Sequence, residues 1–184
     1  MRKLTVFNFV TLNGFYKGPK EDTSWHRHGG EESAYSARML QLGNTLVFGR
    51  VTYDQMAGFW PSAEAMKSLP EVAKGMNEAE KIVFSRTLKK ADWNNTRLIR
   101  DNMADEIKKM KKTPGKDLTI LGSGSIITQM TDLELIDEYQ VMIDPVALGE
   151  GTPMFKGIRQ KLDLELVDSQ VFKSGCVLAT YRRK

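Results

Sequence analysis

The feature that most constrains this chain is the alternation of short apolar segments with helical segments up to about residue 135. The apolar runs are rich in Val, Ile, Leu and Phe and are bounded by turn residues, which is typical of strands buried on both faces of a parallel sheet. Helical patterns separate most of them, as a doubly wound arrangement requires. The predicted strands are residues 4–10, 45–48, 81–84, 97–99, 118–121 and 138–143.

Helices are predicted between these strands, and a hairpin is predicted at the end of the chain. The helical segments are 31–42, 51–56, 63–73 with an interruption at Pro70, 102–112 and 125–130. Residues 162–172 and 176–182 read as two strands joined by a short turn, so we expect an antiparallel pair at one edge of the sheet. The fold class is therefore α/β, with a mainly parallel central sheet, helices on both faces and a single domain over residues 1–184.

Composition excludes several classes of function. The net charge of +4 and the pI of about 9.1 permit anionic ligands, but acidic residues are interspersed with the lysines, so we expect no nucleic-acid partner. No apolar run is long enough for a membrane span, and the N-terminus does not read as a signal peptide. One cysteine, Cys176, excludes an intrachain disulfide and fits a reducing cytoplasm. We expect this cysteine to be buried.

Three turns that follow predicted strands carry residues suited to phosphate. The first turn contains Gly49, Arg50 and Thr52. The glycine permits close approach of the backbone to a ligand, and the start of the helix favours an anion. The guanidinium of Arg50 can form two hydrogen bonds to a phosphate. Ser85 and Arg86 follow the next buried strand. The plainer reading of each turn alone is a strand end whose arginine forms a surface ion pair. Ligands of open α/β sheets bind beyond the carboxyl ends of the strands, where these turns should meet.

The third turn runs from Gly122 through Ser123 and Gly124 to Ser125 and leads into a helix. Its glycines have the first spacing of the dinucleotide fingerprint G-x-G-x-x-G, but Ile127 occupies the last glycine position, so the fingerprint is incomplete. Taken together, the three turns could hold a ligand with more than one phosphate, and the dinucleotide NADPH fits.

The polar stretch 16–30 is a candidate active-site loop. Trp25 could stack on a flat heterocyclic substrate, and His26 is a weak candidate proton donor. A metal site at His26 and His28 is not expected, because the chain offers no further histidine and no nearby cysteine. Glu31 and Glu32 are the acids nearest the start of the first helix. We expect both to be exposed, and Glu32 remains only a weak catalytic candidate.

Five segments carry a resemblance that spans nearly the whole chain: TLNGFYKGP (11–19), FGRVTYDQMAGFWP (48–61), KIVFSRTL (81–88), LTILGSGSIITQM (118–130) and LELIDEYQVMIDPVALGEGTPMF (133–155). In this order they resemble the dihydrofolate reductase fold, and more closely the reductase domain of the riboflavin-biosynthesis deaminase-reductases and the stand-alone bacterial proteins grouped with it. The resemblance implies a three-layer fold, a homodimer to which the closing strands contribute, and NADPH as hydride donor.

The resemblance also implies roles for individual residues. The first turn would hold the adenosine-side phosphates, with Arg50 at the 2′-phosphate, and the second would lie near the adenosine ribose. The third, extended to Ile126, would lie under the pyrophosphate. Val10 and Thr11, at the end of the first strand, would lie near the nicotinamide. The implied cofactor-binding set is Val10, Thr11, Gly49, Arg50, Thr52, Ser85, Arg86, Gly122, Ser123, Gly124, Ser125 and Ile126.

The sequence departs from the family at the substrate. Riboflavin reductases place a substrate-binding Glu just before their glycine turn, where this chain has Leu121. Two functions therefore stay open. One is an NADPH-dependent reductase of a small heterocycle, similar to 5-amino-6-(5-phosphoribosylamino)uracil reductase or dihydrofolate reductase. The other is a nucleotide-binding sensor on the same fold that has lost catalysis.

Overall fold

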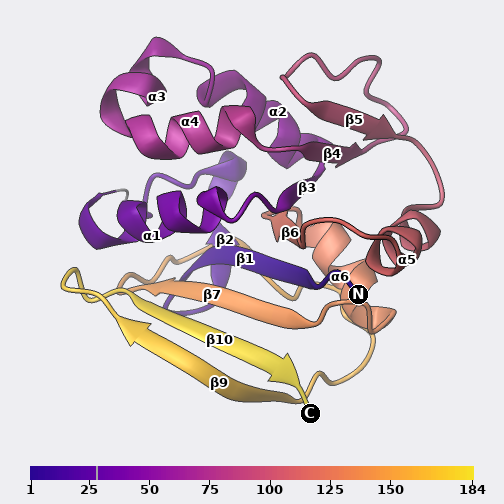
Figure 1. The fold of residues 1–184 in the computed structure, drawn as a ribbon. Coiled ribbons are helices and arrows are strands. Elements are labelled where there is room, and N and C mark those ends of the chain that lie inside the picture. Colours follow the sequence, from indigo (N-terminus) through magenta and orange to yellow (C-terminus); the bar gives the residue numbers. More distant parts are fainter. Residues whose placement is uncertain (28) are drawn as a thin grey trace.

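An eight-stranded sheet runs through the centre of the computed structural model, which describes residues 1–27 and 29–184 (Figure 1). Six strands are parallel, and the last two continue the sheet antiparallel at one edge. In spatial order they are β5 (Thr96–Ile99), β4 (Lys81–Phe84), β3 (Thr45–Gly49), β6 (Leu118–Leu121), β1 (Leu4–Thr11), β7 (Glu138–Asp144), β10 (Val177–Arg183) and β9 (Leu164–Val171). The predicted α/β architecture is confirmed.

Helices cover both faces of this sheet. The core residues show which helix faces which side, because neighbouring residues of β3 point in opposite directions: Val47 packs with one group of helices and Phe48 with the other. On the side of Val47 lie α5 (Met103–Lys112) and α6 (Gly124–Asp132). The opposite side carries α1 (Gly30–Gln41), α2 (Arg50–Phe59), α3 (Ala63–Ser68) and α4 (Pro70–Glu78).

The segment expected as one interrupted helix is two helices, α3 and α4. Pro70 is the first residue of α4, where its missing N–H costs nothing and its ring would block continuation from α3. Lys81, the first residue of β4, follows closely after the end of α4. Its buried ammonium donates hydrogen bonds to the carbonyl oxygens of Met76, Asn77 and Ala79 at 2.6–3.2 Å. No helix in the described part of the chain is both long and apolar enough to cross a membrane.

A second, two-stranded sheet takes one of its strands from the start of the stretch expected to be loop and the other from a distant part of the chain. It pairs β2 (Phe15–Lys17) with β8 (Thr152–Pro153) in antiparallel fashion, and the one-turn helix η1 (Pro19–Glu21) follows β2. Of the closing strands, β9 is shorter than the expected 162–172, and β10 has the expected length but lies one residue later than 176–182. Most side chains of β9 are exposed, as befits a strand at the edge of the sheet.

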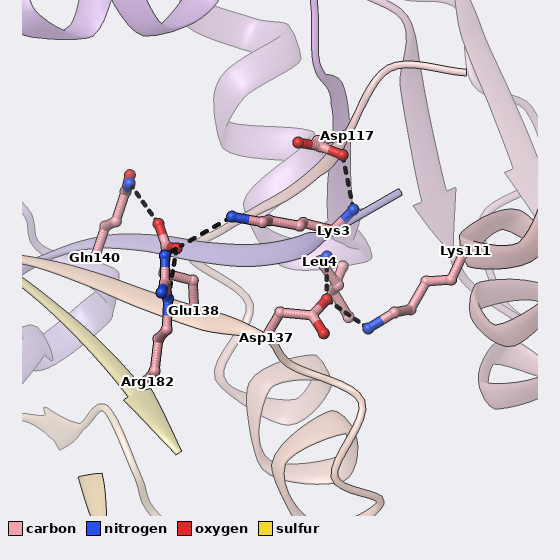
Figure 2. A network of polar contacts seen from close by, with 8 residues as sticks. All are labelled: Lys3, Leu4, Lys111, Asp117, Asp137, Glu138, Gln140 and Arg182. Atoms are coloured by element: carbon pink, nitrogen blue, oxygen red, sulfur yellow. Dashed lines mark hydrogen bonds and ion pairs between the residues drawn. The ribbon is translucent and has the colours of Figure 1, made fainter. Parts of the chain in front are cut away.

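A network of polar contacts fixes the amino end of β1, as Figure 2 shows. The backbone N–H of Leu4 donates to Asp137 at 2.7 Å, and Lys111 of α5 pairs with the same carboxylate at 2.5 Å. Glu138 forms ion pairs with Lys3 and with Arg182 of β10, at 3.8 and 3.2 Å. Asp137 and Glu138 belong to the segment 133–155 that carried the family resemblance. In this structure, their contacts join β1, β7, β10 and α5.

Candidate functional site

A cavity of about 1160 Å³ opens at the carboxyl ends of β3, β4 and β6, where the three predicted turns meet. Gly49, Arg50, Thr52, Ser85, Arg86 and the turn 122–126 all line it. The cavity also continues beneath α1, where Thr5, Glu138 and Gln140 contribute to its wall. The volume is at or slightly above the upper end of the range usual for small-molecule sites.

Ser123 joins the first and third turns. Its hydroxyl accepts a hydrogen bond from the backbone N–H of Gly49 at 2.7 Å, and its own N–H donates to the Thr52 hydroxyl at 3.1 Å. The start of α2 and the start of α6 are thereby held side by side. Neither helix has a side-chain cap, so the first-turn N–H groups of both are suited to an anion.

Close backbone approach requires the glycines of these turns. Gly122 has a φ of +58°, and a Cβ there would lie 2.9 Å from Cγ2 of Thr52. A Cβ on Gly124 would lie 2.7 Å from the hydroxyl oxygen of Tyr16, which β2 places over the start of α6. Sequence reasoning missed Tyr16 as a cavity residue, because its position depends on the pairing of β2 with β8.

The two arginines lie at the cavity but carry ion-pair partners. Nη1 of Arg50 is 3.1 Å from Asp54, one helical turn further along α2, and both side chains are about half exposed. Nε of Arg86 is 3.1 Å from Asp101, and that pair is more exposed still. The hydroxyl of Ser85 accepts from the N–H groups of Thr87 and Leu88 and so shapes the second turn.

The end of β1 differs from the expectation. Val10 and Thr11 are buried and do not line the cavity: Val10 packs in the core with α6, and the hydroxyl of Thr11 bonds to Asn13 and to the N–H of Phe15. The residues of β1 that line it are Thr5, Phe7, Asn8 and Phe9. An amide side chain among the aromatic and β-branched residues of the strand was the signal for Asn8. Contact of Val10 and Thr11 with a nicotinamide ring stays a prediction.

His26 forms a buried pair with Asp144 at the end of β7. Its Nδ1 lies 2.8 Å from the carboxylate, and its ring stacks on Phe9 with centroids 3.5 Å apart. Burial would raise the pKa of Asp144, but the hydrogen bond and charge of His26, the N–H of Arg27 and the thiol of Cys176 together hold that pKa below its ordinary value. An ionised Asp144 only accepts, so Nδ1 of His26 carries the proton that joins them.

Trp25 and Glu32 complete the residues named from sequence. Trp25 is half-buried, lines the cavity and meets His26 edge to face. The expectation that both first-turn acids of α1 are exposed is wrong for Glu32, which is only 4% exposed and also lines the cavity. Ser174, in the turn of the closing hairpin, donates its hydroxyl to Glu32 and covers it. Glu31 is exposed, as expected.

Two further predictions concern a metal and the cysteine. Within residues 1–27 and 29–184, no group of three His, Cys, Asp or Glu side chains is arranged to hold a metal ion. His28 lies outside the described residues, so its pairing with His26 stays untested. Cys176 is buried, as expected, although it lies just before β10 and not within it, and desolvation raises the pKa of its thiol to about 11.

Comparisons with known proteins agree with the fold. The chain is 34% identical to the uncharacterized protein YyaP of Bacillus subtilis (strain 168) over 98% of its own length and 94% of that protein. A proposed riboflavin biosynthesis protein of Shewanella sp. PV-4 superposes with a TM-score of 0.76 at 21% identity, covering 99% of both chains. Dihydrofolate reductase from Enterococcus faecalis, solved with NADP(H), gives a TM-score of 0.63 at 15% identity, covering 99% of this chain and 96% of that one.

The fold is thus dihydrofolate reductase-like, and the similarities support a reductase-type function. The family model described as the RibD C-terminal domain matches residues 2–178. That match covers nearly the whole chain, and this protein therefore belongs to the RibD C-terminal domain family.

Proposed function

We propose that this protein is a reductase that binds NADPH and transfers a hydride to a small heterocyclic substrate. The observation that carries the proposal is the pair of uncapped helix N-termini, those of α2 and α6, locked together by Ser123 at the cavity. Two adjacent helix starts give many N–H donors for the pyrophosphate of a dinucleotide. When bound, the dihydronicotinamide ring would supply the hydride.

The arginines suit the adenosine end of the cofactor. The ion pair between Arg50 and Asp54 is solvent-exposed, and such pairs contribute about 0–1 kcal/mol. A phosphate is a stronger, multidentate acceptor, so it can take the guanidinium of Arg50 away from Asp54 at little cost. The same holds for Arg86 and Asp101. This argues for the 2′-phosphate of NADPH over the plain ribose of NADH.

The rest of the cavity suits a flat substrate with hydrogen-bonding edges, such as an aminopyrimidine or a pterin. Trp25 and Phe9 supply aromatic surface, and Thr5 and Gln140 supply polar groups under α1. Glu32 and His26 are the titratable side chains best placed to orient the substrate or to deliver a proton. Ser174 holds Glu32 and Asp144 holds His26, so each has a fixed orientation.

The test is a titration with NADPH and NADH, followed by quenching of tryptophan fluorescence, on wild type, Arg50→Ala and Arg159→Ala. Arg159 is an exposed arginine that does not line the cavity, and it serves as the control. We expect Arg50→Ala to lose about tenfold or more in NADPH affinity, the worth of one charge-assisted bond, with little change for NADH. Arg159→Ala should leave both unchanged. Failure of the wild type to bind either nucleotide would refute the proposal.

The non-catalytic alternative predicts the same binding but no turnover. NADPH oxidation measured with a panel of aminopyrimidines and pterins separates the two functions. The expected homodimer also remains a proposal. It is supported by the edge strand β9, where Leu166 and Val171 are 57% and 73% exposed.

A further inference from the structure

The amide of Asn8 is unusual in this molecule. Across residues 1–27 and 29–184, its Nδ2 is the only buried side-chain nitrogen or oxygen without a hydrogen-bond partner. The residue is 5% exposed, lies in the central strand β1 and lines the cavity. Buried polar groups are nearly always paired, so an unpaired donor at a cavity wall calls for an explanation.

The orientation of this amide is set by its other end. Oδ1 of Asn8 accepts a hydrogen bond from the backbone N–H of Gly122 at 2.8 Å. A backbone N–H can only donate, so the oxygen must face Gly122, and turning the amide over would set two donors against each other. The neighbouring residue in the β7 register is Val141, which offers no side-chain acceptor. The donor hydrogens of Nδ2 therefore have no acceptor among the described residues, and a ligand acceptor would reach them only by seating closely against the cavity wall at Asn8.

The order of the strands shows which part of a bound dinucleotide would lie there. Arg86 follows β4, Arg50 follows β3, the glycine turn follows β6, and Asn8 lies on β1, and these four strands are consecutive neighbours in the sheet. In the proposed pose, the adenosine half lies at the two arginines and the pyrophosphate lies at the glycine turn. The next strand in the sheet is β1, so β1 would meet the nicotinamide half, which lies beyond the pyrophosphate.

We propose that Nδ2 of Asn8 donates a hydrogen bond to an acceptor oxygen on the nicotinamide half of the cofactor, and that it is a positioning residue for that half. This inference rests on the proposed function. The nicotinamide half carries ribose hydroxyls and the carboxamide carbonyl, all of which accept hydrogen bonds. Because Gly122 anchors the same side chain, Asn8 couples the pyrophosphate turn to the placement of the nicotinamide.

Asn8→Asp is the sharpest variant. It retains an oxygen for the N–H of Gly122 but replaces the donor with an oxygen that repels the ligand's acceptor. The ligands are NADPH and 2′,5′-ADP, which contains only the adenosine half. We expect NADPH to bind about tenfold or more weakly, the effect of one buried hydrogen bond lost, and 2′,5′-ADP to bind as in wild type. Asn94→Asp, an exposed change away from the cavity, controls for the added charge.

Lowering the pH provides a second readout. A buried aspartic acid takes up a proton more readily than an exposed one, and its O–H then donates where Nδ2 did. The NADPH affinity of Asn8→Asp should therefore recover partly from about pH 8 to about pH 5.5, relative to wild type. Asn8→Ala has no group to protonate and also removes the acceptor of the Gly122 N–H, so it should weaken NADPH more than 2′,5′-ADP and show no recovery. It replaces Asn8→Asp if the latter does not fold.

Three outcomes would overturn the inference. One is unchanged NADPH affinity in both variants. Another is an equal loss for NADPH and 2′,5′-ADP, which would mean that the substitution only disturbs the Gly122 turn. The third is a wild type that binds neither ligand, which refutes the proposed function itself and is distinguishable from the first two by the wild-type titration alone.

Discussion

Replacing Ser123 by alanine tests whether this side chain holds the two helix starts together. The hydroxyl of Ser123 is the acceptor for the N–H of Gly49, at 2.7 Å, and the residue is only 6% exposed. The alanine variant leaves that partly buried N–H at the cavity wall without its acceptor. A fully buried donor left unsatisfied costs about 1–3 kcal/mol in the free energy of unfolding, so we expect a loss toward the lower end, about 1 kcal/mol. The hydroxyl does not cap α6, so no capping loss adds to this figure.

Urea unfolding followed by tryptophan fluorescence measures this loss, and Ser125→Ala is the matched control. Ser125 is exposed on the first turn of the same helix, so its replacement should change the free energy of unfolding by no more than about 0.5 kcal/mol. Thr52→Val removes the acceptor of the other link, and the double variant should show coupling of about 0.5 kcal/mol or more. If Ser123→Ala is as stable as Ser125→Ala, the bridge does not hold the turns and the reasoning is refuted.

Three further predictions concern other parts of the molecule. Burial lowers the pKa of Lys81 to about 8 from 10.5, so the unfolded chain binds more protons between these values. The free energy of unfolding should therefore rise as the pH increases from about 8 to 10.5 in wild type, but not in Lys81→Met. Urea unfolding at each pH measures it. The thiol of Cys176, with its pKa raised to about 11, should resist a disulfide reagent at about pH 8 in the folded protein and react on unfolding. A reaction as fast as that of a free thiol would contradict this. Val171→Lys should shift the proposed dimer toward monomer in light scattering, whereas Leu133→Lys, an exposed position outside β9, should not.

The strands and the site turns could be predicted from sequence because their signals are local. The run that forms β3 is four apolar or β-branched residues followed by Gly49, and such a pattern leaves few alternatives. The same is true of β6 and its glycine turn. The break at Pro70 was also readable, although the helix after it extends five residues further than expected, to Glu78.

Other features depend on residues that are far apart in the chain, and no local pattern encodes them. Buried Glu32 has its hydrogen-bond partner in Ser174, 142 residues away. Buried His26 has its partner in Asp144, 118 residues away. The three-residue strand β2 exists through its pairing with β8. The same reason explains why sequence reasoning named Ser123 as a pyrophosphate contact without foreseeing that it bridges two turns.

The pairing of His26 with Asp144 also limits how the segment over the cavity can move. Withdrawing His26 would leave the buried carboxylate of Asp144 without this hydrogen-bond partner, and this loss of a buried hydrogen bond opposes detachment of the segment. We therefore expect the movement that admits a ligand to fall on the chain before His26, from η1 to Trp25, while the contacts with Asp144 and Phe9 keep His26 against the central sheet.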